Sequence, residues 1–129
     1  MAKHLTKEQL LLIHEEVCKE YKEDLTILFE SQLDLIIDAP SRSVFDFTPY
    51  TTLNDKAGAL MHEGLKLHPF LCGNKRTALL ATKTFLEQNG RILKVEDPDQ
   101  KEVCLRTTQC SLGIKDLSTW IEVNTVSRP

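Results

Sequence analysis

Hydrophobic residues near the start of the chain recur every three or four positions, which is the spacing of one face of an α-helix. The stripe consists of Leu10, Ile13, Val17 and Tyr21. Just before it, Thr6 and Gln9 have the spacing of a capping box, and Leu5 and Leu10 have that of a hydrophobic staple. The pattern therefore predicts a helix that begins directly after Thr6.

The next segments are shorter. A helix is predicted from about Glu30 to Asp38, and Pro40 limits it because the residue before a proline avoids the α region. Between residues 41 and 52, polar and turn-prone stretches flank an alternating apolar pattern, which is typical of extended chain. Its members are Val44, Phe45, Asp46 and Phe47. We expect a short extended segment there, too short to make a sheet by itself.

Two longer helices are predicted on either side of a proline. The first runs from about Thr52 to Leu67, keeps its apolar residues on one face and must end before Pro69. The second runs from Asn74 to Asn89 and is apolar most of the way round, which is typical of a helix surrounded by others. Gly90 follows it as a C′ residue that can adopt positive φ.

The rest of the chain predicts two more helices. Asp97, Pro98 and Gln100 have the spacing of an N-cap, an N1 proline and an N3 partner, and this helix gives out near Gly113. A last helix carries Leu117, Trp120 and Ile121. Without a repeat, low-complexity tract or linker, we expect one all-α domain over residues 1–129. It would be a bundle of about six helices around the helix that begins at Asn74.

The charge balance narrows the classes of partner. The chain has 16 basic and 19 acidic residues, for a formal net charge of −3. General binding to nucleic acid or to anionic membranes needs a basic excess instead. No apolar run approaches the ~20 residues of a membrane span, and the first four residues lack the hydrophobic region of a signal peptide. We expect a cytoplasmic protein that binds neither nucleic acid nor membrane directly.

The four cysteines are spread along the chain without a Cys-x-x-Cys pair, so thiols are expected rather than disulfides in a reducing cytosol. Three are expected to be structural and buried or half-buried, because free Cys is among the most buried residue types. They are Cys18, Cys104 and Cys110. A metal site can be drawn from His14 with Cys18, or from His62, His68 and Cys72. Both fall short of the four closely arranged ligands that zinc normally takes.

The segment from His68 to Arg76 combines a titratable imidazole with groups that bind anions. It lies where the Asn74 helix should begin, and the free N–H groups and positive dipole end of a helix N-terminus bind phosphate. Gly73 lets the backbone approach closely, and Asn74 can donate its side-chain amide. Lys75 adds a point charge, and Arg76 can bind two phosphate oxygens at once. A neutral imidazole can take the proton of an attacking hydroxyl.

Each of these residues also has an ordinary structural interpretation. His68 alone fits a capping or packed histidine, and Gly73-Asn74 alone fits a turn. Lys75 and Arg76 alone fit a solvated surface pair. Phe70 is expected to anchor the loop in the core rather than to contact a ligand. The spacing of the whole set favours a phosphate site with a proton acceptor beside it.

The segment His68-Pro69-Phe70-Leu71-Cys72-Gly73-Asn74-Lys75-Arg76 resembles the signature of the Fic/Doc family, and Lys75 resembles its Doc branch. The likeness extends to residues 5–16, 53–66 and 77–90, and it is looser over residues 25–50. The resemblance implies an all-α Fic/Doc-like fold with His68 as the general base. It implies that ATP is bound by Gly73, Asn74, Lys75 and Arg76. It also makes Val44, Phe45, Asp46 and Phe47 the candidate for the flap that docks the protein target.

The resemblance also implies a reaction. Doc toxins transfer the terminal phosphoryl group of ATP to a threonine of elongation factor Tu, and they stay active until a small antitoxin protein binds. Family members with glycine at the position of Lys75 transfer AMP to a protein hydroxyl instead. We therefore expect a Doc-like protein phosphotransferase of a toxin-antitoxin pair, with AMP transfer as the alternative.

Cys72 departs from the family pattern, in which an acidic residue at this position helps to hold Mg²⁺. Mg²⁺ prefers oxygen ligands, and a thiol is a soft ligand. Cys72 is therefore the candidate for the metal position and also a predicted defect in it. Three outcomes follow: a slow enzyme, metal held by another carboxylate such as Glu63 or by water, or a module that binds nucleotide or antitoxin without turnover. A nucleophilic role for Cys72 is the least favoured, because the substrate supplies the acceptor hydroxyl.

Overall fold

The computed structural model describes residues 2–42, 49–109 and 111–129. This part of the chain contains six α-helices, one 3₁₀ turn and two short strands. They are α1 (Lys7–Tyr21), α2 (Glu30–Asp38), η1 (Ala39–Ser41), α3 (Leu53–Lys66), α4 (Asn74–Gln88), β1 (Arg91–Leu93), α5 (Asp97–Thr108), α6 (Ile114–Asn124) and β2 (Thr125–Ser127). The prediction of an all-α fold is confirmed. The predicted flap at Val44–Phe47 and the residue Cys110 lie outside the described residues.

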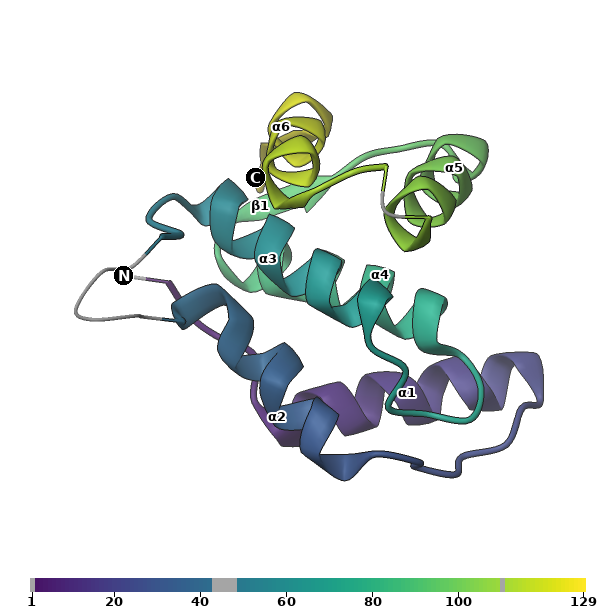
Figure 1. Cartoon of the computed structure of the whole chain (residues 1–129). Helices are drawn as coiled ribbons and strands as arrows, with labels where there is room; N and C mark the ends of the chain where they lie inside the picture. The colour runs from purple at the N-terminus through teal and green to yellow at the C-terminus, as the bar shows by residue number, and fades with distance from the viewer. Residues whose placement is uncertain (1, 43–48, 110) are drawn as a thin grey trace.

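The helices form three layers (Figure 1). α3 and α4 lie in the middle, α1 and α2 cover one side, and α5 and α6 cover the other. Two glycines bring the backbone of α3 close to its neighbours. A Cβ on Gly64 would lie 2.9 Å from the Cβ of Ala78 in α4, and one on Gly58 would lie 3.0 Å from the carbonyl oxygen of Ile114 in α6. α3 therefore shares the central position that the hydrophobic pattern predicted for α4 alone.

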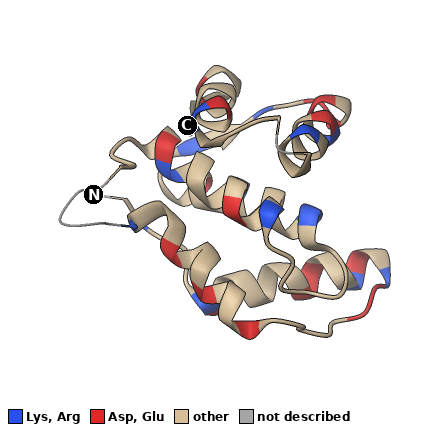
Figure 2. Cartoon of the chain, viewed as in Figure 1, with Lys and Arg blue, Asp and Glu red and all other residues tan. Residues whose placement is uncertain are grey.

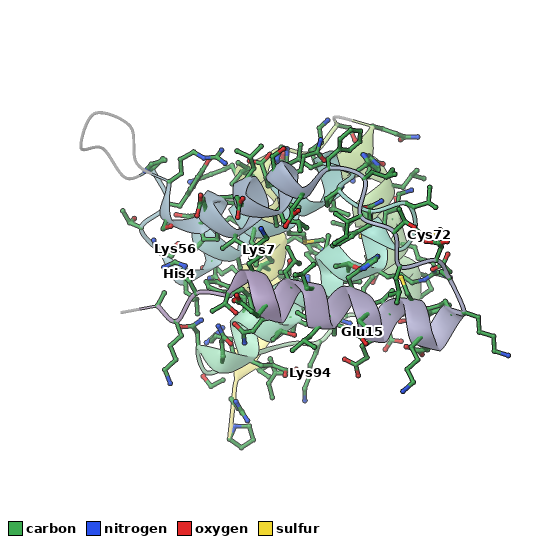
Figure 3. The ribbon with its side chains drawn as sticks, turned by 90° about the horizontal axis from the view of Figure 1, so that it is seen from below. His4, Lys7, Glu15, Lys56, Cys72 and Lys94 are labelled. Carbon is green, nitrogen blue, oxygen red and sulfur yellow. The ribbon has the colours of Figure 1, made fainter. Side chains whose placement is uncertain are left out.

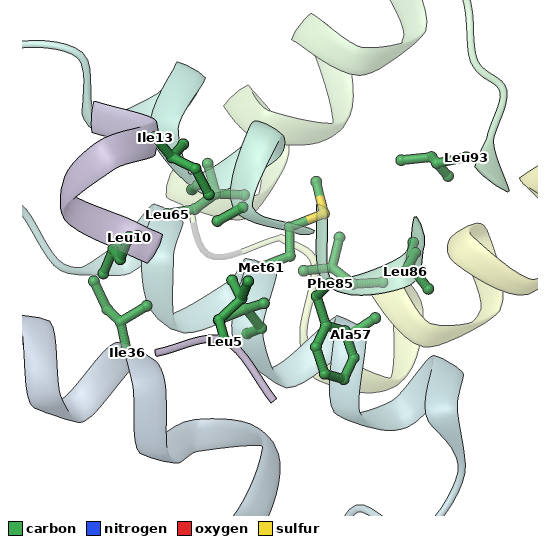
Figure 4. Close-up of a cluster of buried hydrophobic side chains, with 14 of the residues drawn as sticks. Leu5, Leu10, Ile13, Ile36, Ala57, Met61, Leu65, Phe85, Leu86 and Leu93 are labelled. Carbon is green, nitrogen blue, oxygen red and sulfur yellow. The ribbon is translucent and has the colours of Figure 1, made fainter. Parts of the chain in front are cut away.

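The core lies between these layers, and Figure 4 shows part of it. α1, α2, α3, α4 and β1 each contribute buried side chains. Those labelled in the figure from these elements are Leu10, Ile13, Ile36, Ala57, Met61, Leu65, Phe85, Leu86 and Leu93. Full burial of a large apolar side chain contributes about 1.5–3 kcal/mol. Packing of these stripes therefore holds the helices that carry the site.

The predicted helix starts of α1 and α3 are confirmed by their caps. Thr6 Oγ1 accepts from the backbone N–H of Gln9 at 3.1 Å, and the Gln9 side chain accepts from the backbone N–H of Thr6 at 3.0 Å. Thr52 caps α3 by accepting from the backbone N–H of Asp55. Gly90 has φ +84°, as expected of a residue that follows a helix end.

Two features after α4 differ from the prediction. β1 and β2 pair antiparallel, with Arg91 opposite Ser127. These strands were not predicted, because three residues are too few to form a recognisable sequence pattern. α5 begins one residue early: its N-cap is Glu96 rather than Asp97, without a side-chain capping bond. The expected N3 partner Gln100 is buried instead, and its amide donates to the Val95 carbonyl at 2.6 Å.

A carboxylate joins α3 to α6. The Ser118 hydroxyl donates to Asp55 Oδ1 at 2.6 Å. This bond, helped by Thr52 and by Lys115 nearby, lowers the pKa of the Asp55 carboxyl below its ordinary value, although partial burial acts in the opposite direction. Within the described residues, none of the helices has both the length and the apolar character needed to cross a membrane.

Candidate functional site

The segment predicted to bind phosphate, residues 68–76, connects α3 to α4, and we call it the signature loop. The preceding segment of residues 25–29 pairs with it. The Pro69 carbonyl accepts from the backbone N–H of Leu28 at 2.7 Å, and Ile27 forms an isolated bridge with Phe70. Phe70 is 2% exposed, so its predicted role as a core anchor is confirmed. The loop is thus held from outside by the chain that follows α1.

The end of the signature loop is the N-terminus of α4. Gly73 is the N-cap and has φ +78°, a conformation that favours glycine. A Cβ there would also lie 3.3 Å from Val17 Cγ1 in α1. The first turn of α4 contains Lys75 and Arg76 and no acidic residue. Its leading backbone N–H groups have no intrahelical partner, so this helix end attracts anions.

All five residues predicted for catalysis and phosphate binding line one hollow of about 690 Å³. They are His68, Gly73, Asn74, Lys75 and Arg76. Figure 2 shows basic positions gathered where α3 ends and α4 begins. The remaining lining was not predicted and comes from α1, α4 and α5. It consists of Tyr21, Leu79, Asp97, Gln100, Lys101 and Cys104.

The Arg76 side chain is exposed, but two contacts hold it in place. Its Nη1 lies 3.2 Å from Glu23 Oε1, and its guanidinium lies over the ring of Tyr21 at 3.8 Å from the centroid. A carboxylate and an aromatic face are the partners that a guanidinium prefers in the absence of an anionic ligand. These two contacts connect Arg76 to the end of α1, and Arg76 and Tyr21 both line the hollow.

Asn74 closes the signature loop on itself. Its Oδ1 accepts from the backbone N–H of Phe70 at 3.1 Å, and its Nδ2 donates to the Phe70 carbonyl at 2.8 Å. If Asn74 also donated to a phosphate as predicted, its Nδ2 would have to bind both the phosphate and the Phe70 carbonyl. The structure thus gives Asn74 a role in holding the loop, and the spacing of four residues between Phe70 and Asn74 was the signal that could have indicated it.

His68 lines the hollow and is exposed. Its backbone N–H donates to Gln32 Oε1 in α2 at 3.1 Å. α3 ends at Lys66 and its C-cap Leu67 has extended backbone, so the helix ends before Pro69 as predicted. His68 therefore faces the same hollow as the α4 N-terminus from a point fixed by two helices.

Beneath the loop lies the His14–Cys18 pair, which the sequence indicated only as a weak metal site. His14 is 2% exposed and its ring stacks on Phe70, with centroids 3.5 Å apart and planes 7° apart. Its Nε2 lies 2.9 Å from the Cys72 carbonyl and 3.2 Å from Cys18 Sγ. Burial, with Glu23 close by, raises the pKa of the Cys18 thiol. Both side chains thus contact the signature loop or its neighbours, which no local pattern indicated.

The surroundings of Cys72 do not fit a protein-held Mg²⁺ ion. Its carbonyl is taken by His14, and its thiol is not among the groups that line the hollow. Figure 3 shows Cys72 beside the C-terminal half of α1. Across residues 2–42, 49–109 and 111–129, no three His, Cys, Asp or Glu side chains gather as metal ligands would. The alternative carboxylate Glu63 is paired with Arg42 at 2.9 Å.

The cysteines that the structure describes are free thiols, as predicted. Cys18 and Cys104 are buried, and Cys72 is half-buried. Burial raises the pKa of the Cys104 thiol, although Lys75 and Lys83 nearby act against that shift. His62, part of the second metal interpretation, has its pKa lowered by burial and by Lys66.

Comparison with known proteins shows the same family that the signature residues resemble. A model described as the Fic/DOC family matches residues 4–86, from before α1 to near the end of α4. The chain is similar to a protein named Toxin Doc from Mycolicibacterium smegmatis (strain ATCC 700084 / mc(2)155), at 37% identity over 84 residues. That alignment covers 62% of this chain and 65% of the relative, so it spans slightly less than two thirds of the relative's length. The α5 wall of the hollow lies beyond the residues that match the family.

Proposed function

Because this chain belongs to the Fic/DOC family and is Doc-like, we propose that it is an ATP-dependent protein phosphotransferase that acts as a toxin. The reaction would move the γ-phosphoryl group of ATP to a hydroxyl of a protein target. One observation carries the proposal: His68 and the four signature residues of the α4 N-terminus line a single hollow. The name of the relative, Toxin Doc, supports the toxin assignment and a small antitoxin protein as partner.

ATP fits the hollow in size and charge. Ligand pockets commonly measure about 300–1,000 Å³, and this hollow measures about 690 Å³. Lys75 and Arg76 supply positive charge, and Gly73 lets the backbone N–H groups of the α4 start come close to phosphate oxygens. Binding of ATP would draw Arg76 from Glu23 to a phosphate, a change of partner at an exposed pair.

In the proposed step, His68 is the general base. Its imidazole takes the proton of the target hydroxyl while that oxygen attacks the γ-phosphorus. The bond between the γ-phosphorus and the β,γ-bridging oxygen breaks, and ADP leaves. The N–H groups and cations at the α4 start stabilise the charge on the transferred group. The family implies Mg²⁺ on the phosphates, but the described side chains do not form its site, so no step is assigned to it.

The surface beside the loop supports a protein as the acceptor. A group of large apolar side chains on and opposite the signature loop is between 41% and 53% exposed. It comprises Leu25, Ile27, Leu28, Phe29 and Leu71. Exposed apolar groups of this kind mark protein-binding surfaces. Elongation factor Tu is the proposed target. This apolar surface would be a second docking surface, in addition to the flap predicted at Val44–Phe47.

The experiment labels the protein target with ATP that carries ³²P at either the γ or the α position. Purified native chain is incubated with elongation factor Tu, Mg²⁺ and each label in parallel. Label from the γ position alone supports phosphotransfer. Label from the α position instead would establish the AMP-transferase alternative and refute the proposal.

Cys72 favours a second candidate, a module that binds nucleotide or antitoxin with weak or no turnover. Cys72→Asp, assayed beside the native chain, separates the two. If a carboxylate at this position can hold Mg²⁺, as the family's acidic residue does, transfer by the variant should rise about tenfold or more. Transfer by the aspartate variant alone would identify the native chain as a disabled relative. Equal transfer by both would show that Cys72 is no defect.

A further inference from the structure

The buried residue His14 has no place in the reaction described above, yet it contacts the signature loop at two points, the Cys72 carbonyl and the Phe70 ring. We propose that His14 is a positioning residue: its Nε2–H holds the Cys72 carbonyl and so turns the Gly73 N–H toward the phosphate-binding hollow. That the Gly73 N–H binds a phosphate rests on the proposed function. The contact between His14 and the Cys72 carbonyl is a property of the fold.

The partners of His14 determine its tautomer. A carbonyl oxygen only accepts hydrogen bonds, so the 2.9 Å contact with Cys72 requires the proton on Nε2. The Cys18 thiol, 3.2 Å from the same nitrogen, donates to the Asp24 carbonyl at 3.5 Å and leaves its sulfur as a second acceptor. These two acceptors therefore select the Nε2-protonated imidazole.

The geometry of one peptide bond connects this contact to the hollow. The Cys72–Gly73 peptide is trans, because the described chain has no cis peptide bond. In a planar trans peptide the C=O and the N–H point in opposite directions. The carbonyl points at His14 in α1, so the Gly73 N–H points away from α1, and Gly73 lines the hollow.

The ring of His14 makes the second contact. It lies parallel to Phe70 at 3.5 Å between centroids, and Phe70 is bound in turn by both groups of the Asn74 amide. Two points of the loop, Phe70 and Cys72, are thus fixed by one side chain. A ring without the N–H would keep the contact with Phe70 and lose the one with Cys72.

The test uses two substitutions that separate these contacts. His14→Phe keeps a flat ring and removes the donor, whereas His14→Gln keeps an N–H at a similar reach and removes the ring. Ile13→Val, a buried change in the core on the same helix, serves as the stability control. Each variant is measured for melting temperature, for ATP affinity by calorimetry and for its Gly73 amide by ¹H–¹⁵N NMR.

We expect His14→Phe to weaken ATP binding about tenfold and to shift the Gly73 amide resonance. His14→Gln should stay within about threefold of the native affinity, and Ile13→Val should leave both readouts unchanged. A merely structural role would make ATP affinity follow melting temperature in all three variants, and that result would overturn the proposal. Native affinity in His14→Phe would overturn it as well.

The same measurements keep this inference apart from the proposed function. If the native chain binds no ATP, the phosphotransferase proposal fails, and the positioning role is judged by the spectra alone. ¹⁵N NMR of the native imidazole should then show protonation at Nε2, and His14→Phe should move the Gly73 amide. A proton on Nδ1 only, or an unmoved amide, would refute the role of His14.

Discussion

The two walls of the hollow are built in different ways. The signature wall is the side of the hollow formed by the signature loop. It is fixed by contacts between residues far apart in the sequence, such as His14 with Cys72 and Ile27 with Phe70. The α5 wall presents Asp97 and Lys101, both exposed, and it lies beyond the residues that match the family. Under the proposed function, the first wall would bind the phosphates of ATP, and the second, outside the family match, would contact the part of the ligand attached to them.

The largest expected effect comes from the loss of the base. His68→Ala should reduce transfer by about 100-fold or more, because general-base catalysis contributes about 10²–10⁴. ATP affinity should stay within about twofold, since the imidazole acts on the proton and not on the phosphates. Label transfer and calorimetry on the same preparation measure both. Full activity in the variant would end the assignment of His68 as base.

The second prediction compares two glycines with similar backbone. Gly73 and Gly90 have φ of +78° and +84°, and only at Gly73 would an added Cβ meet other atoms within 4 Å. Alanine at either site should cost about 1–2 kcal/mol of folding stability. Only Gly73→Ala should also abolish measurable ATP binding, because a Cβ 3.3 Å from Val17 would shift the loop.

Urea unfolding and calorimetry of both glycine variants carry this test. Loss of ATP affinity in Gly90→Ala as well would mean that global stability, rather than the conformation of the signature wall, controls binding.

The third prediction concerns the cation at the rim. Arg76→Ala should weaken ATP binding about tenfold or more, because it removes a charge-assisted, bidentate donor. Arg42→Ala is the matched control, since Arg42 also forms an ion pair, with Glu63, but does not line the hollow. The control should change neither affinity nor stability beyond about 1 kcal/mol. Unchanged calorimetry for Arg76→Ala would contradict the phosphate site.

The smallest expected effect at the site belongs to the α5 wall. Asp97→Ala should change ATP affinity by less than about threefold, because an exposed carboxylate is well solvated. Its effect should appear in the ratio of affinities for ATP and for inorganic triphosphate, which lacks the nucleoside. If Asp97→Ala weakens both ligands as strongly as Arg76→Ala does, the two walls do not differ in role.

Local signals predicted much of the fold. The capping box at Thr6, the proline at residue 69 and the glycine at residue 90 mark helix ends that the structure confirms. The signature residues were found because they are consecutive. The two strands were missed because they are three residues long and lie on either side of α5 and α6 in the sequence. The N-cap of α5 was misplaced by one residue, and the side chain of Gln100, its expected N3 partner, bonds instead to the Val95 carbonyl and to Lys83.

The floor of the site shows why the rest could not be predicted. His14 and Cys72 are 58 residues apart, and nothing near either one in the sequence announces their contact. The run from Leu25 to Phe29 is apolar enough to attract notice, but its pairing with Pro69 and Phe70 depends on the tertiary fold. Such long-range contacts determine how the consecutive residues of the signature loop are oriented in the fold.

The bond between Ser118 and Asp55, two residues that do not line the hollow, gives the molecule a response to acid. The pKa of Asp55 is lowered in the folded protein, so its contribution to stability is present above the ordinary carboxyl pKa and is lost as pH falls through the folded value. Ser118→Ala should therefore cost about 0.5–1 kcal/mol at neutral pH, and the difference should close in acid. Unfolding curves at neutral and acidic pH would measure it, and a gap independent of pH would contradict it. Acid would then weaken one polar contact that joins α6 to α3.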